Sequence, residues 1–304
     1  MFAQYFGQYL LSQGHLTSTQ LYEALTAQKD ARPKLGVLAI NHGWMTGSQV
    51  EEVHAEQMSR DKRFGEIAVE QGYLTEEQVQ ELLLSQKSEH LLLGQTLIDQ
   101  GLMTYDSFSE VLGAFKEAYS LSSDQFSSIL QGNVDALVSA VLLKDGLPAG
   151  EWLSGYVSLF AKNLIRFADT GVRLEMAIAP RPSVYDWVFS QEITAEGTAE
   201  AGYTAVAGSQ ESMLRLASRF AQETISAPDE LFEAAAGELL NLHNGIFLVN
   251  MSDRGTELSM EPQHTARSIP EDTLAKLQAI RIYGTDYEVD LLISDLTPLL
   301  RQPS

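Results

Sequence analysis

The sequence has no cysteine and comparatively few basic residues. Without a thiol, disulfide bonds, cysteine–zinc sites and cysteine nucleophiles are excluded. The chain holds 20 Lys and Arg against 41 Asp and Glu, which gives a formal net charge of -21. A surface this acidic repels the phosphates of nucleic acid and the anionic headgroups of a bilayer. We therefore expect neither nucleic acid nor an anionic lipid surface among its partners.

Long apolar runs and familiar ligand spacings are missing as well. No stretch approaches the ~18 apolar residues that predict a membrane-spanning helix, and no basic start followed by an apolar run predicts a signal peptide. We therefore expect a cytoplasmic location and no membrane insertion. The six histidines show no metal-ligand spacing, so no metal site is predicted. Walker loops, G-x-S-x-G and dinucleotide fingerprints are absent too, and we expect no cofactor of its own.

A chain of 304 residues suits two domains, and its first part is an internal repeat. Four segments read FGQYLLSQGHLT, LGVLAINHGWMT, FGEIAVEQGYLT and LGQTLIDQGLMT. Two series of glycines each recur every 29 residues: Gly7, Gly36, Gly65 and Gly94, then Gly14, Gly43, Gly72 and Gly101. Self-similarity at a fixed period of this size predicts stacked helical units. We expect an all-α helical repeat domain over residues 1–116.

Each repeat is predicted to form two helices. The second glycine suits the left-handed position that ends the first helix. The threonine three residues later is an N-cap candidate for the second helix, and a glutamine follows at the capping-box spacing in three repeats: Gln20, Gln49 and Gln78. The second helix is expected to close near Gln28, Gln57 and Gln86. The fourth repeat departs from this pattern, with Ser107 and Phe115 at the matching positions.

This half resembles the N-terminal domains of type II secretion and type IV pilus ATPases, whose repeats carry a basic residue, Leu-Gly, a later Gly and a closing Gln. Some members of that family, the MshE-type domains, bind cyclic di-GMP through the basic residue. The resemblance places Lys34 and Arg63 in that role, whereas Tyr5 and Leu92 stand there in the outer repeats. Two alternatives stay open, a cyclic di-GMP site and a helical module that docks a protein.

The hydrophobic pattern changes in the second half. Residues 117–155 are expected to form a helical connector, because Gly146, Pro148 and Gly150 follow an apolar helix near 134–143. Beyond it, a helix over 156–168 precedes alternating strands over 185–194 and 203–207 and a helix over 211–222. Strands over 246–251 and 256–261 and a hairpin over 277–294 complete the pattern. This order predicts an α+β domain over residues 156–304, with helices packed on an antiparallel sheet.

A helix over Pro228–Asn244, ended by Gly245, carries the candidate site. At about 100° per residue, one strip of this helix is apolar and is expected to be buried: it holds Leu231, Ala235, Leu239, Leu242 and Ile246. A second strip places Glu238 and Asn241 one turn apart, between the small residues Ala234 and Gly245. A partner surface is expected to approach both side chains closely.

The segment AAAGELLNLHNGIFLVN resembles the E-x-x-N signature of the CheC/CheX/FliY phosphatases. In that family the Glu and Asn of one helix enter the active site of a phosphorylated receiver domain, and the matching residues here are Glu238 and Asn241. The first helix, YVSLFAKNLIRF, lacks a second such motif, so the pattern is similar to the CheX type. The resemblance implies a CheY-like response regulator as partner, in chemotaxis or two-component signalling, with Mg²⁺ on that partner. It also implies a homodimer through a sheet edge.

The chemistry expected of this pair needs no shifted pKa. A carboxamide donates and accepts hydrogen bonds, so Asn241 could hold a water in line with the scissile P–O bond of an aspartyl phosphate. Glu238 would pair with the receiver's lysine and so set register. Two functions remain open at this point: a receiver phosphatase regulated by the repeats, and a signalling adaptor that keeps the docking face without turnover, or responds to cyclic di-GMP.

Overall fold

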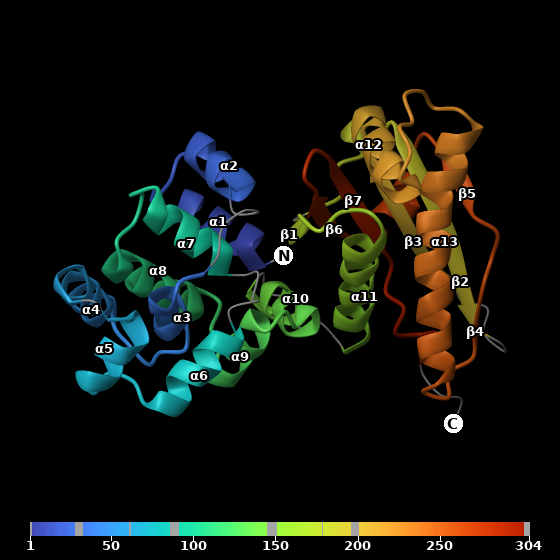
Figure 1. The fold of residues 1–304 in the computed structure, drawn as a ribbon. Coiled ribbons are helices and arrows are strands. Elements are labelled where there is room, and N and C mark those ends of the chain that lie inside the picture. Colours follow the sequence, from blue (N-terminus) through green and yellow to red (C-terminus); the bar gives the residue numbers. More distant parts are fainter. Residues whose placement is uncertain are drawn as a thin grey trace. The chain divides into compact units, whose positions relative to one another are not determined.

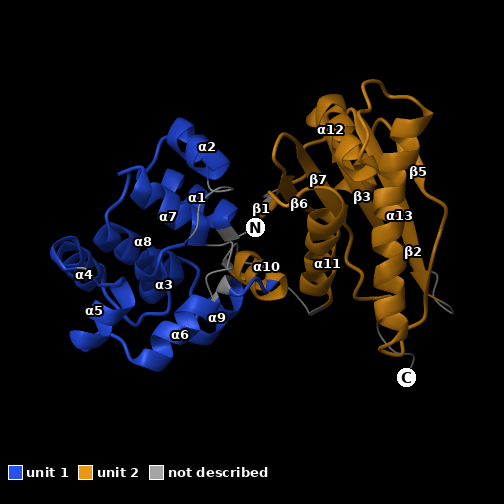
Figure 2. Ribbon diagram, viewed as in Figure 1, with its two compact units in different colours: residues 1–133 blue, residues 134–304 orange. Residues whose placement is uncertain are grey.

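A computed structural model of the chain describes residues 2–27, 33–60, 62–85, 91–144, 151–177, 179–195 and 201–300. The chain divides into two compact units, residues 1–133 and 134–304, coloured separately in Figure 2. The connector expected over 117–155 has helices in both: α9 (Ser123–Leu130) belongs to the first unit and α10 (Val134–Lys144) to the second. The domain boundaries drawn from sequence, at 116 and 156, stay predictions.

The first unit is built from helices throughout its described residues (Figure 1). Each repeat contributes two of them, in chain order α1 (Phe2–Ser12), α2 (Ser18–Ala27), α3 (Leu35–Asn41), α4 (Gly47–Ser59), α5 (Phe64–Glu70), α6 (Glu76–Ser85), α7 (Leu92–Asp99) and α8 (Tyr105–Ala118). The predicted second-helix ends at Gln28 and Gln86 lie outside the described residues. The third, Gln57, lies within α4, which runs two residues further.

The two glycine series have different physical roles. The first series lets the two helices of a repeat touch: a Cβ on Gly36 would lie 2.5 Å from Val50, and one on Gly94 would lie 2.5 Å from the Phe108 ring. Gly7 and Gly65 meet Leu21 and Val79 in the same way, at 2.6 and 2.8 Å. Each partner stands fourteen residues after its glycine. The 29-residue period of these glycines therefore corresponds to a recurring close contact between the two helices of each repeat.

The second glycine series and the threonines end and begin helices as predicted. Gly14, Gly43, Gly72 and Gly101 have φ between 68° and 75°, in the region that favours glycine. Reciprocal capping bonds join each threonine to the residue three positions on: they occur at Thr17 and Gln20, Thr46 and Gln49, Thr75 and Gln78, and Thr104 and Ser107. In the fourth repeat, Ser107 stands in place of the glutamine and still completes the capping box with Thr104.

The second unit is a seven-stranded antiparallel sheet with helices on it. Its strands are β1 (Arg173–Ala177), β2 (Trp187–Ala195), β3 (Ala201–Gly208), β4 (Leu258–Met260), β5 (His264–Ala266), β6 (Gln278–Tyr283) and β7 (Glu288–Ile293). Their order is β1-β6-β7-β3-β2-β4, and β5 also pairs with β2. The expectation of helices packed on an antiparallel sheet is confirmed for this unit. Two strands, β1 and β5, were not anticipated from the sequence.

One face of the sheet is covered by α11 (Glu151–Phe167), α12 (Gln210–Ala221) and α13 (Glu230–Ser252), as Figure 1 shows. The ring of Phe232 on α13 packs edge-on against Trp187 and Phe189 of β2, with centroids 4.9 and 5.6 Å apart. These contacts seat α13 over β2. Because side chains alternate along a strand, Gln191 and Ile193 face α13 as well. α11 begins at Glu151, five residues before the predicted start.

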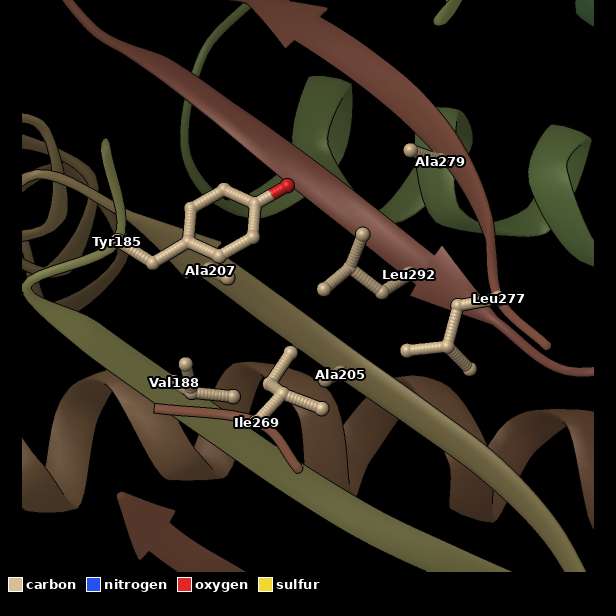
Figure 3. Packing of buried hydrophobic residues seen from close by; sticks show 8 residues of the cluster. All are labelled: Tyr185, Val188, Ala205, Ala207, Ile269, Leu277, Ala279 and Leu292. Atoms are coloured by element: carbon tan, nitrogen blue, oxygen red, sulfur yellow. The ribbon is translucent and has the colours of Figure 1, made fainter. Parts of the chain in front are cut away.

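The opposite face carries a smaller apolar cluster, which Figure 3 shows. Alternate side chains of β2, β3, β6 and β7 meet residues from the segments beside them, and the members are Tyr185, Val188, Ala205, Ala207, Ile269, Leu277, Ala279 and Leu292. The connection after β5, which includes the short α14 (Glu271–Leu274), supplies Ile269 and Leu277 to this cluster. Both faces of the central strands are therefore buried, and α13 packs on a sheet that is held from both sides.

Two predictions about the site helix are wrong. The helix does not end at Gly245 but continues to Ser252, so the strand expected over 246–251 is the last part of α13. An apolar run containing isoleucine and valine reads as a strand, yet here Phe247 and Met251 extend the helix's buried face. The buried strip is also rotated from the expected one: Leu231 is 44% exposed, and Phe232 beside it is fully buried.

Candidate functional site

Glu238 and Asn241 lie one turn apart on α13, as the spacing predicts. Asn241 donates a hydrogen bond from Nδ2 to Oε2 of Glu238 over 3.1 Å. The Glu238 side chain is exposed, whereas Asn241 is half-buried. The pair therefore presents a carboxylate to solvent and an amide at the edge between the helix and the sheet.

Asn241 is also bonded to the sheet. Gln191 of β2 donates from Nε2 to Oδ1 of Asn241 over 3.2 Å, and from the same nitrogen to the backbone oxygen of Glu261 over 2.9 Å. Gln191 is only 3% exposed. The Asn241 amide is therefore held from both sides, by a buried amide beneath it and by a carboxylate one turn away.

A buried polar network continues from Gln191 into the core. Asn244, on the buried face of α13, donates from Nδ2 to Oε1 of Gln191 and to Oγ1 of Thr204, each over 2.9 Å. Thr204 lies opposite Gln191 in the β2–β3 register and donates to the Gln191 backbone oxygen over 2.9 Å. Tyr156 of α11 donates to Oδ1 of Asn244 over 2.6 Å. Four elements thus meet in one hydrogen-bonded chain that ends at Asn241.

The surroundings of the strip differ in one respect from the expectation. Gly237 does leave room for a close neighbour, but that neighbour is Gln263 of the same chain, whose side-chain amide occupies the place a Cβ would take. The segment between β4 and β5 therefore borders the pair on one side. Of the two small residues that flank the pair along the helix, Ala234 is exposed and Gly245 is half-buried.

His243 is close in sequence to Glu238 and Asn241 but makes no contact that joins it to this pair. It is fully buried, and its ring packs edge-on against Tyr156 and Phe160 with centroids 4.3 and 4.9 Å away. Burial lowers the pKa of His243 to about 3, so the imidazole is neutral near pH 7. Nδ1 lies 3.3 Å from Nδ2 of Asn163. Within the ranges that the structure describes, no His, Asp and Glu side chains gather as a metal site.

Lys34 and Arg63 occupy equivalent places in their repeats, as N-cap residues of α3 and α5. Both are exposed. The Lys34 ammonium is paired with Asp99, Nζ to Oδ1 at 2.7 Å, and this hydrogen bond raises the lysine's pKa. The backbone nitrogen of Arg63 donates to Glu66 over 2.8 Å. The cyclic di-GMP site stays a prediction, and the Asp99 pairing is a competitor that a nucleotide phosphate would have to displace from Lys34.

The sequence pattern did not predict four residues of this network: Gln191, Thr204, Asn244 and Tyr156. A signal was present for Gln191, because it stands between Phe189 and Ile193 on the face of β2 that is buried. A polar residue in such a place needs a partner. Asn244 likewise stands three residues after Asn241 on the buried side of α13. Which partners they would find could not be read from the spacing.

The comparisons with known proteins concern about half of the chain. No family model and no curated protein matches it. A CheC-like superfamily protein from Shewanella sp. PV-4 is similar at 15% identity, covering 47% of this chain and 96% of that chain with a TM-score of 0.39. The chemotaxis protein CheX from Vibrio vulnificus is similar at 13% identity, with 48% and 99% covered and a TM-score of 0.38.

A third similar structure is a CheX–CheY complex with BeF₃ and Mg²⁺ from Borrelia burgdorferi. Its identity is 11%, the coverage is 47% of this chain and 97% of that one, and the TM-score is 0.40. Similarity at this level does not transfer the activity of those proteins to this chain. Among the described residues, no helix is long and apolar enough to cross a membrane.

Proposed function

We propose that the second unit removes the phosphoryl group from a phosphorylated CheY-like receiver domain, in chemotaxis or two-component signalling. The observation that carries the proposal is the joined pair on α13, an exposed Glu238 bonded to a half-buried Asn241. The E-x-x-N resemblance gives the pair its assignment. The pair's placement on a rigid helix seated over the sheet is what such chemistry requires.

Asn241 is the residue that orients water in this proposal. A carboxamide has two N–H donors and an oxygen with two lone pairs. Glu238 takes one donor and Gln191 occupies one acceptor position, so one donor and one acceptor position remain for a water. A water held at both positions can be aimed along the line of the scissile P–O bond. The receiver supplies its own Mg²⁺ and the phosphoryl group in this reaction.

Glu238 is the docking residue. An exposed carboxylate on the free side of a helix can pair with a lysine of the receiver, which fixes the register in which Asn241 enters. The same carboxylate accepts the hydrogen bond of Asn241. Docking by Glu238 and water orientation by Asn241 therefore involve adjacent, hydrogen-bonded side chains. Substituting Glu238 should affect docking, and substituting Asn241 should affect turnover.

The test is a phosphate-release assay with the whole chain and the receivers encoded in the same genome. Each receiver is loaded with acetyl phosphate, and its dephosphorylation is followed with and without the protein. Acceleration of at least one receiver's decay supports the proposal. A receiver that binds and decays at its intrinsic rate would instead identify a signalling adaptor. No binding and no acceleration with any receiver would refute both.

A further inference from the structure

The buried Gln191 lies beneath the half-buried Asn241 and donates a hydrogen bond to it. We propose that Gln191 is a positioning residue that fixes the orientation of the Asn241 amide, with Oδ1 turned toward the sheet and Nδ2 toward Glu238. For its effect on rate, this inference rests on the function proposed above. For the orientation itself, it rests only on hydrogen-bond chemistry.

The backbone carbonyl of Glu261 determines the orientation of the Gln191 amide. A carbonyl oxygen can only accept, so the Gln191 atom 2.9 Å from it must be the donor Nε2. The same nitrogen faces Asn241 at 3.2 Å, and it can only donate there too. Asn241 must therefore present its acceptor, Oδ1, to Gln191. A main-chain carbonyl thus determines which side of the Asn241 amide faces the solvent.

The other end of Gln191 is fixed independently. Its Oε1 accepts from Nδ2 of Asn244, and the Asn244 oxygen accepts from Tyr156. Thr204 identifies this nitrogen, because its only proton is used elsewhere and it can therefore only accept from Asn244. The second proton of that Nδ2 goes to Thr204, whose hydroxyl proton is donated to a main-chain oxygen. Gln191, Asn244 and Thr204 are all at most 3% exposed. Reversing Gln191 would place its oxygen against the Glu261 carbonyl and its nitrogen against Nδ2 of Asn244. Reversing Asn244 would place its oxygen against Oε1 of Gln191. Such contacts between like groups are costly in a site from which water is excluded.

The orientation also suits the proposed chemistry. With Oδ1 bonded to Gln191, one proton of Asn241 Nδ2 is bonded to Glu238, and the other proton and the second lone pair of Oδ1 remain for the water. In the reversed orientation, Oδ1 would face the Glu238 carboxylate, and two acceptors would repel each other. Gln191 therefore removes a rotational state in which the water site would be lost.

The decisive variant is Gln191→Met, which keeps the length of the side chain and removes its donors and acceptor. We expect kcat for receiver dephosphorylation to fall about five- to tenfold, which is the factor expected for loss of one neutral hydrogen bond that acts in the transition state. KM for the receiver should stay within about twofold, because Glu238 still docks it. Gln191→Met should change nothing further in an Asn241→Ala background, since its effect passes through Asn241.

A matched control separates positioning from general loss of a buried amide. Asn163 of α11 is 4% exposed and bonds to His243, not to Asn241. Asn163→Leu also removes a buried amide, and it should leave kcat unchanged at a temperature where both variants are folded by circular dichroism. Equal losses of kcat in the two variants would overturn the proposal, as would additive losses in the double variant with Asn241→Ala.

A measurement on the free protein tests the orientation without any turnover. In nuclear magnetic resonance spectra of the whole chain, the Asn241 Nδ2 protons should show cross-peaks to Glu238 side-chain protons. These cross-peaks to Glu238 should weaken in Gln191→Met, where the amide is free to turn, but not in Asn163→Leu. Cross-peaks that place Nδ2 beside Gln191 in the wild type would overturn the proposal, even if Gln191→Met failed to fold.

The kinetic and spectroscopic results also distinguish the positioning role of Gln191 from the phosphatase activity on which its rate effect rests. The expected spectra in a protein that accelerates no receiver would leave the orientation standing and refute the phosphatase. An active wild type with unchanged Asn241 spectra in Gln191→Met would leave the phosphatase standing and refute the positioning role.

Discussion

Asn241 donates from Nδ2 to Oε2 of Glu238 over 3.1 Å, so an amide and a carboxylate one turn apart act on a common space beside α13. The amide is anchored to the sheet and the carboxylate is exposed. This difference in anchoring gives the two residues separable roles, and substitutions of each should have different kinetic signatures.

Asn241→Ala is expected to reduce kcat for receiver dephosphorylation by at least about 100-fold, since it removes the group that orients the water. Stability should fall by only about 1 kcal/mol, because Gln191 keeps its bond to the Glu261 carbonyl. The control is Asn250→Ala, which truncates an exposed asparagine of the same helix. Phosphate release and thermal unfolding measure the two effects. Wild-type turnover by Asn241→Ala would sink the catalytic assignment.

Glu238→Gln should weaken docking while leaving the fold unchanged. The substitution removes the charge that pairs with a receiver lysine but keeps an oxygen that can accept from Asn241. We expect KM to rise about fivefold or more, an increase that diminishes as salt rises. Glu233→Gln, at another exposed position of α13, is the matched control. If the two variants have the same KM at low salt, Glu238 has no docking role.

Gly94→Ala and Gly113→Ala should change stability in opposite directions. A Cβ on Gly94 would meet the Phe108 ring at 2.5 Å, so the pair of helices must separate, at a cost of about 1–3 kcal/mol. Gly113 lies in α8 with nothing within 4 Å of its added Cβ. Alanine there should stabilise by up to about 1 kcal/mol through helix propensity. Urea unfolding of the two variants checks both signs, and a neutral Gly94→Ala would contradict the packing role of the repeat glycine.

The buried His243 makes stability depend on pH. Its pKa is lowered to about 3 by burial in the folded state, whereas an unfolded histidine titrates near ~6.5. Between these two pH values the imidazole is protonated in the unfolded chain and neutral in the folded chain, so the free energy of unfolding falls as pH decreases. From pH 7 to pH 5 this amounts to about 2 kcal/mol. The loss should be smaller by that amount in His243→Leu, as measured by urea unfolding at both pH values. Parallel losses in the two proteins would contradict the assignment.

The second unit should be more stable when α10 is included. This helix packs on α11 and β1, and it buries Leu137 and Leu142. The fragment 134–304 should therefore melt higher than 151–304 by roughly 4–8 °C, which corresponds to about 2 kcal/mol at this size. Calorimetry of both fragments gives the comparison. Equal melting temperatures would mean that α10 contributes nothing to this unit and belongs to the connector expected from the sequence.

The sequence alone determined the features that depend on local chemistry. Recurring glycines marked both the left-handed helix ends and the close helix contacts of the first unit, because only glycine suits both without a steric cost. Threonine and its partner three residues on marked the caps. The spacing of Glu238 and Asn241 placed them together on one helix, since residues three apart are neighbours on any α-helix.

Tertiary structure decided the rest, because burial and polar partnership depend on elements distant in sequence. Local pattern predicted a strand after Gly245, but packing of Phe247 and Met251 extended the helix. The helix's buried strip was set by where Trp187 and Phe189 meet Phe232. The orientation of Asn241 was set by Gln191, fifty residues away, and by a carbonyl on a third segment. No spacing rule relates these groups, since they become neighbours only when helix and sheet pack and exclude the water that would otherwise satisfy them.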